Sequence, residues 1–166
     1  DAMAAFGYSS FFVEKTLGRF ALGVDFVTES LETETRDHTK TDLLAKASGA
    51  AASVTQLIKV DFENLTTAYV SFMLTENLYV SAGSVTVDVV TKETLGTGSV
   101  YGNTSLDGTT WGAGYHKAFD NGMFIRGSAH LLEFAGKSLE SSTGLNSVEV
   151  DQMNGVSGKI SVGKSF

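Results

Sequence analysis

The sequence predicts an all-β fold, namely an antiparallel up-and-down β-barrel that forms a single domain over residues 1–166. Apolar and polar residues alternate along several segments, as in strands with one apolar face. The chain has 18 glycines and no proline, which suits long hydrogen-bonded strands. Its longest alternating segments exceed the about 5 to 6 residues typical of soluble strands. No segment approaches the roughly 20 apolar residues of a membrane-spanning helix, so the chain could cross a bilayer only as a closed barrel. A soluble all-β protein remains the alternative.

The first two predicted strands cover residues 5–16 and 19–28. In the first, Phe11 and Phe12 are adjacent and Glu14 follows, so either aromatic could face inward. The second alternates regularly, and its apolar face consists of Phe20, Leu22, Val24 and Phe26.

The next two strands cover residues 58–74 and 78–91. Most even-numbered residues of the third strand are apolar, and we expect them to face outward. They are Ile58, Val60, Phe62, Ala68, Val70, Phe72 and Leu74. By the same reasoning, we expect the fourth strand to present Val85, Val87 and Val89 outward.

Residues 109–119 and 123–138 are predicted to pair around a turn at residues 120–122. This register places Trp111 opposite Leu131, Tyr115 opposite Gly127, and His116 opposite Arg126. We expect His116 to be neutral beside the guanidinium. The last strand ends at Phe166, and its apolar parity is interrupted by Lys164, whose long side chain can reach the headgroup level.

Short and long connections alternate along the chain. Short turns are predicted near Gly18, Glu76 and Asn121, and long loops at residues 29–56, 92–108 and 141–146, with a short helix available at 43–52. This gives seven strands, and an odd count would leave two unpaired sheet edges. We therefore expect an eighth strand, either upstream of Asp1 or supplied by a partner chain. The alternative is that residues 29–56 contain another strand.

The terminal strand and the Gly-Val-Asp-Phe-Val run from Gly23 resemble the small outer-membrane β-barrels grouped with the transmembrane domain of outer-membrane protein A. The resemblance implies an even number of strands, eight here, in the outer membrane of a Gram-negative cell envelope. It implies outer loops and a periplasmic C-terminus, in contact with outer-membrane lipids and lipopolysaccharide. It also implies that the barrel-assembly machinery reads the final strand through Val156, Ile160, Val162 and Phe166.

The family's fold does not determine function. We expect a structural or surface-interaction protein that presents its loops, with a narrow porin-like channel for small solutes or ions as the alternative. A homo-oligomer or a strand-donating neighbour is a further expectation about partners.

The residues that alternate with the apolar positions are expected to face inward, and they include charges of both signs. We expect these to pair within the lumen: Arg19, Asp25, Asp88, His116, Arg126, His130 and Lys159. The alternative is an ion or proton path along the same residues. Aromatic residues near the strand ends are predicted to anchor the barrel at the membrane interfaces, with Tyr79, Phe119, Phe124 and Phe166 at the turn end and Trp111 at the other.

Several functions are not supported by the sequence. A net charge of −7 without a basic stripe argues against nucleic acid as a partner. The chain has no cysteine and no GxSxG, HExxH or P-loop motif, and His38 beside Asp37 is a weak catalytic signal, so we expect no enzyme. The acidic residues of the first long loop could bind calcium or a lipopolysaccharide-bridging cation: Glu29, Glu32, Glu34 and Asp37. Exposed carboxylates usually remain solvated, however, so no cofactor or metal is expected.

Overall fold

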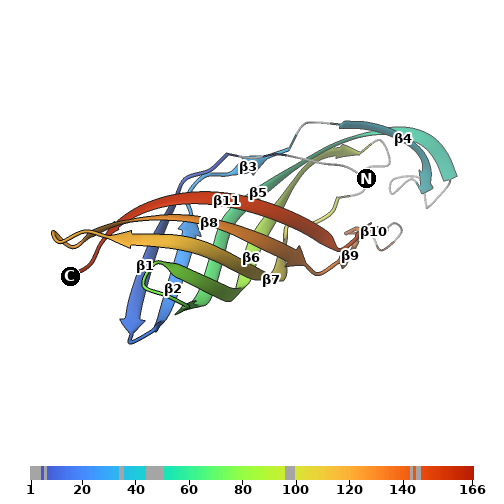
Figure 1. The fold of residues 1–166 in the computed structure, drawn as a ribbon. Helices are drawn as coiled ribbons and strands as arrows, with labels where there is room; N and C mark the ends of the chain where they lie inside the picture. Colours follow the sequence, from blue (N-terminus) through green and yellow to red (C-terminus); the bar gives the residue numbers. More distant parts are fainter. Residues whose placement is uncertain are drawn as a thin grey trace.

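The computed structural model describes residues 5, 7–33, 36–43, 51–95, 100–142, 144 and 147–166. This part of the chain is all-β, and its main sheet is antiparallel and curls into an open half-barrel (Figure 1). The prediction of an all-β antiparallel fold is therefore confirmed. The short helix expected at residues 43–52 is not present at its described ends, because Leu43 and Ala51 belong to strands.

Seven strands follow one another across the sheet in chain order: β1 Ser10–Leu17, β2 Phe20–Val27, β5 Ala51–Met73, β6 Leu78–Leu95, β7 Thr104–Ala118, β8 Met123–Phe134 and β11 Met153–Lys164. Each neighbouring pair is antiparallel. Within the described residues, β1 pairs only with β2 and β11 only with β8, so these two strands form the edges of the sheet.

The three predicted short turns lie at one end of the half-barrel, which we call the turn end. Gly18 and Gly122 have φ angles of 64° and 80°, in the left-handed region that glycine adopts without steric cost. The chain also terminates here, since the Ser165 amide donates to the Gly122 carbonyl at 2.9 Å. The opposite end is the loop end. The predicted register of β7 and β8 is confirmed, including the His116–Arg126 pair.

The predicted loop at residues 29–56 is wrong in part. This segment contains β3 (Leu31–Glu32) and β4 (Arg36–Leu43), both of which pair with β5. Its alternation is difficult to detect because threonine, aspartate and alanine are frequent in it. β5 and β6 consequently extend together beyond the half-barrel, and β4 lies against the far part of β5 (Figure 1).

The connection between β8 and β11 also contains strands. The segment predicted as one strand, residues 123–138, ends as β8 at Phe134. A small hairpin follows, formed by β9 (Lys137–Glu140) and β10 (Ser147–Val150).

The predicted loop at 92–108, between β6 and β7, is shorter than expected, because β6 continues to Leu95 and β7 begins at Thr104.

A β-bulge in β5 reverses which side chains face inward. The register with β6 shifts between Glu63 and Thr66, and Asn64 has a φ angle of 53°. On the turn-end side of the bulge, Val70 faces outward as predicted. On its other side, Phe62 packs inward, contrary to prediction. The bulge adds one residue, which shifts the inward–outward alternation by one position. Even-numbered residues such as Phe62 and Val70 therefore face opposite ways on the two sides of the bulge.

The inner face at the loop end holds a small apolar core. Val85, Val87 and Val89 of β6 are 0, 3 and 6% exposed, and a core cluster joins Val87 and Val89 to Leu106. Six partly buried residues surround them: Val60, Phe62, Leu65, Phe134, Val150 and Met153. The prediction that these valines face outward is wrong. Alternation shows that β6 has an apolar face, but it does not show which face the rest of the chain covers.

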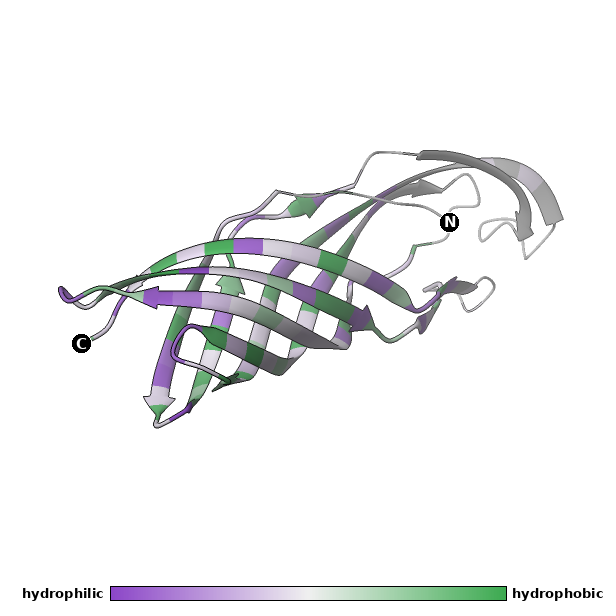
Figure 2. Cartoon of the chain, in the orientation of Figure 1, coloured by the Kyte–Doolittle hydropathy of each residue, from purple (hydrophilic) through white to green (hydrophobic). Residues whose placement is uncertain are grey.

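The outer face of the turn-end half carries exposed large apolar side chains on all seven strands, and Figure 2 shows the corresponding apolar bands. We call this surface the apolar belt: Phe11, Val13, Leu17, Phe20, Leu22, Val24, Phe26, Val70, Leu74, Leu78, Val80, Trp111, Tyr115, Phe119, Ile125, Leu131, Val156, Ile160, Val162 and Phe166. Ile160 is 85% exposed and Val13 is 80% exposed. The belt is thus continuous from one sheet edge to the other.

Candidate functional site on the concave face

An ion pair between opposite walls of the half-barrel occupies the concave face near the turn end. Arg126 of β8 donates from Nη1 and Nη2 to the two carboxylate oxygens of Glu14 in β1, at 2.7 and 2.6 Å. The Arg126 and Glu14 side chains are 14 and 8% exposed. This paired geometry is the strongest that a guanidinium and a carboxylate form. The sequence of the first strand does not identify Glu14 as a partner, because the adjacent Phe11 and Phe12 leave open which side chains face inward.

Further side chains hold this ion pair in place. Arg126 Nε donates to His116 Nδ1 at 3.0 Å, and the Tyr69 hydroxyl donates to Glu14 Oε2 at 3.1 Å. The bond to His116 requires Nδ1 to be unprotonated, in agreement with a neutral imidazole. The guanidinium carbon also lies 4.7 Å from the Phe124 ring centroid and 5.6 Å from that of Tyr79. The cluster therefore combines a charge-assisted pair with cation–π contacts.

Tyr79 and Phe124 are corrections to the predicted interface anchors. Both lie on the concave face and are only 8 and 7% exposed. They fit there because the neighbouring strand has a glycine beneath each ring, Gly114 below Tyr79 and Gly163 below Phe124. The other predicted anchors are exposed, Trp111 by 60%, Phe119 by 44% and Phe166 fully.

The same ring-over-glycine packing recurs across the concave face. Tyr69 covers Gly23 and His130 covers Gly112. In all four cases, a Cβ on the glycine would overlap atoms of the ring. The inward glycines therefore make room for large side chains inside a narrow half-barrel.

A second polar cluster lies on the same concave face. Lys159 of β11 pairs with Asp25 of β2, again across the half-barrel. His130 Nε2 lies 3.0 Å from Ser128 Oγ on the same strand. These four residues line a cavity of about 80 Å³, which is large enough for a few water molecules.

The two clusters include five of the seven residues predicted for the lumen: Asp25, His116, Arg126, His130 and Lys159. Arg19 is elsewhere, because it belongs to the β1–β2 turn and donates to the carbonyls of Met73 and Leu74 at 2.9 and 2.7 Å. Asp88 is also elsewhere. It alternates with the buried valines of β6 and accepts a 2.9 Å bond from Asn64 on the outer face.

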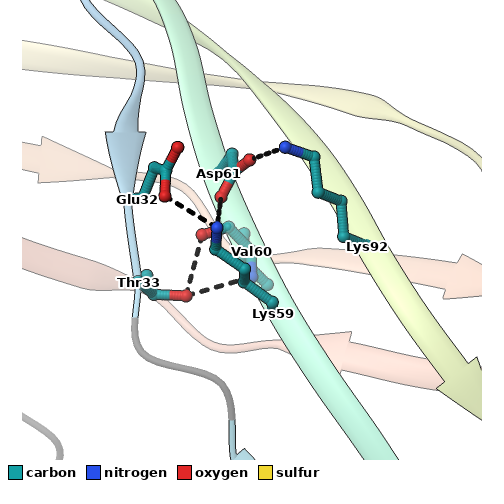
Figure 3. Close-up of polar contacts among 6 residues, drawn as sticks. All are labelled: Glu32, Thr33, Lys59, Val60, Asp61 and Lys92. Atoms are coloured by element: carbon teal, nitrogen blue, oxygen red, sulfur yellow. Dashed lines mark hydrogen bonds and ion pairs between the residues drawn. The ribbon is translucent and has the colours of Figure 1, made fainter.

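A separate ionic cluster lies on β5 and β6 beyond the apolar belt (Figure 3). Asp61 is fully buried, and the ammonium groups of Lys92 and Lys59 both contact its carboxylate. Lys59 also pairs with Glu32 of β3 at 2.7 Å. The hydrogen bond from Lys92 lowers the pKa of Asp61, and the charge of Lys59 acts in the same direction against the opposing effect of burial.

This cluster attaches β3 to β5 together with the backbone. Thr33 Oγ1 donates to the Val60 carbonyl at 2.8 Å and accepts from the Val60 amide at 3.0 Å (Figure 3). The prediction of Glu32 as a solvated loop residue is therefore wrong, and no pattern in the sequence indicates that Asp61 is buried. Glu34 lies outside the described residues, and the side chains of Asp37 and His38 are not described.

Within the described ranges, no group of histidine and carboxylate side chains is arranged to hold a metal ion. The described residues also include no helix long and apolar enough to cross a membrane.

No protein-family model, curated protein or solved structure matches this chain.

Proposed function

We propose that this chain forms the wall of a β-barrel in the outer membrane of a Gram-negative cell envelope, with a lumen filled by side chains. The observation that carries the proposal is the apolar belt on the outside of a sheet whose inside is charged. Water-soluble monomers rarely expose continuous apolar patches larger than a few hundred Å². In a bilayer the same arrangement is favourable, because each Å² of apolar surface removed from water stabilises by about 25 cal/mol.

Strand direction supports closure by one further strand. β1 and β11 are the first and last of seven antiparallel strands, so both run toward the turn end. Direct pairing between them would be parallel. A strand running from the turn end to the loop end would pair antiparallel with both, and would satisfy the edges that a bilayer cannot hydrate. A segment joined to β1 by a loop-end connection in a longer chain would run in this direction, and a strand donated by a neighbour would have to enter in the same direction.

The interior supports a structural or surface-interaction protein. Two ion pairs cross the concave face, Arg126–Glu14 and Lys159–Asp25. The valine cluster around Leu106 occupies the loop end. The segments available to a partner are then those at the loop end, including the part of β5 and β6 that extends beyond the half-barrel. The alternative, a narrow channel for small solutes or ions, would have to use the cavity beside His130 and pass this apolar cluster.

The orientation and assembly follow from the proposal. The turns and the C-terminus would lie in the periplasm, and the loop end would meet lipopolysaccharide. Val156, Ile160, Val162 and Phe166 face outward along the edge strand or just beyond it, where the assembly machinery could bind them.

The test is insertion into lipid of the purified protein, produced with any segment that precedes β1 in its gene. We expect protein diluted from urea into phosphatidylcholine vesicles to float with the vesicles, to yield a protease-protected fragment, and to migrate differently on gels before and after boiling. Complete digestion, no flotation and no change of migration on boiling would contradict the proposal.

A further inference from the structure

Charged side chains that border the apolar belt are sorted by sign. At the turn end the belt includes three exposed lysines, Lys15 of β1, Lys117 of β7 and Lys164 of β11. Each alternates with belt residues of its own strand, as Lys117 does between Tyr115 and Phe119. All three therefore project outward from the apolar surface.

The opposite border is acidic. Four neighbouring strands carry outward carboxylates there, in the order Glu63, Asp88, Asp107 and Glu133. Glu63 lies directly opposite Asp88 in the ladder, and Asp88 is bonded to the Asn64 amide rather than to a cation. Lysines farther along β5 and β6 are already paired with Asp61 and Glu32.

The three turn-end lysines are available to a ligand. No described carboxylate lies within ion-pairing distance of their ammonium groups, and Lys164 instead lies 5.4 Å from the Phe166 ring centroid. Arg19 is occupied by backbone carbonyls, and the carboxylates at this end, Glu76 and Asp120, lie at the tips of turns. A lysine stem can lie along apolar surface while its ammonium group reaches the headgroup level.

We propose that the turn-end border of the belt binds the phosphate groups of anionic phospholipids, through Lys15, Lys117 and Lys164. This inference rests on the proposed membrane insertion. It matches ligand to site by charge, because the three lysines attract anionic headgroups and the acidic border offers no unpaired cation to bind them. The sorted charges therefore assign the turn end to the leaflet that contains anionic phospholipid.

The experiment measures which lipid lies next to Lys117. Trp111 is the only tryptophan, so a Trp111→Phe, Phe119→Trp variant moves the fluorophore beside Lys117. Quenching by brominated phosphatidylglycerol is compared with quenching by brominated phosphatidylcholine in refolded vesicle samples. We expect an about fivefold preference for phosphatidylglycerol at this position, the effect of one lysine near an anionic surface. Unsubstituted Trp111, nearer the acidic border, should show no such preference.

Single substitutions identify the responsible side chain. Lys117→Gln should abolish the preference and Lys117→Arg should keep it. Lys137→Gln, at the loop end, changes the net charge equally and should leave the preference intact. Equal quenching by both lipids beside Lys117, or a preference that survives Lys117→Gln, would overturn the inference while leaving insertion established. Absence of quenching by either lipid at both positions would instead show that the proposed insertion itself is wrong.

Discussion

At the scale of single residues, the Glu14–Arg126 pair is the contact whose loss we expect to cost most. It joins strands at opposite sides of the curled sheet, and both side chains are largely buried. Removing one charge leaves the other without its partner in a poorly hydrated site. Breaking a buried pair in this way typically costs about 3 to 5 kcal/mol.

We therefore predict that Glu14→Gln lowers the free energy of unfolding by about 3 kcal/mol. Urea titration of the protein in vesicles or detergent, followed by Trp111 fluorescence, would measure it. The matched control is Glu14→Gln combined with Arg126→Met, which removes both charges and should recover part of the loss. Equal stabilities of the single variant and the parent protein would refute the assignment.

Asp61 provides a pH-dependent prediction at the same scale. Because its pKa is lowered in the folded protein, its contribution to stability is present above the ordinary carboxyl pKa of about 3.9 and is lost as the pH falls through the lowered value. We expect the Thr33 amide, which donates to the Val60 carbonyl at 3.0 Å, to lose protection from hydrogen exchange on acidification in that window. Asp61→Asn should remove this pH dependence. An unchanged profile in that variant would show that another group is responsible.

At the scale of elements, ring-over-glycine packing predicts a contrast between two glycines of one hairpin. Gly114→Ala places a Cβ into the Tyr79 ring and should destabilise by about 1 to 3 kcal/mol, the usual cost of overpacking. Gly127→Ala meets no atom within 4 Å and should change stability by less than about 0.5 kcal/mol. Unfolding titrations of the two variants provide the comparison, and equal effects would contradict the packing described.

Some features of these elements can be predicted from the sequence, and others cannot. The turn at residues 120–122 places the two flanking strands in one register, so the His116–Arg126 pair could be predicted. The bulge at Asn64 could not, because no local pattern distinguishes an extra residue from continuous alternation. The inward valines of β6 were assigned to the wrong face, since the covering residues Phe134 and Met153 are distant in sequence. Glu14 was missed for a related reason, because its partner lies on a strand remote in the chain.

At the scale of the whole molecule, charged and apolar side chains are distributed differently on the inner and outer faces of the half-barrel. The inner face combines ion pairs near the turn end with an apolar core near the loop end. The outer face has an apolar belt with a basic border and an acidic border. One environment that accounts for this order is a bilayer around the turn-end half, with the β5–β6 extension beyond it.

Trp111 gives the most direct test of that central claim, because it belongs to the belt, is 60% exposed and is the only tryptophan. The measurement is its fluorescence in refolded vesicle samples with lipids brominated along their acyl chains. Contact with the hydrocarbon predicts strong quenching by the bromine atoms and no quenching by iodide in the aqueous phase. A folded protein whose Trp111 is quenched by iodide and not by brominated lipid would contradict the account.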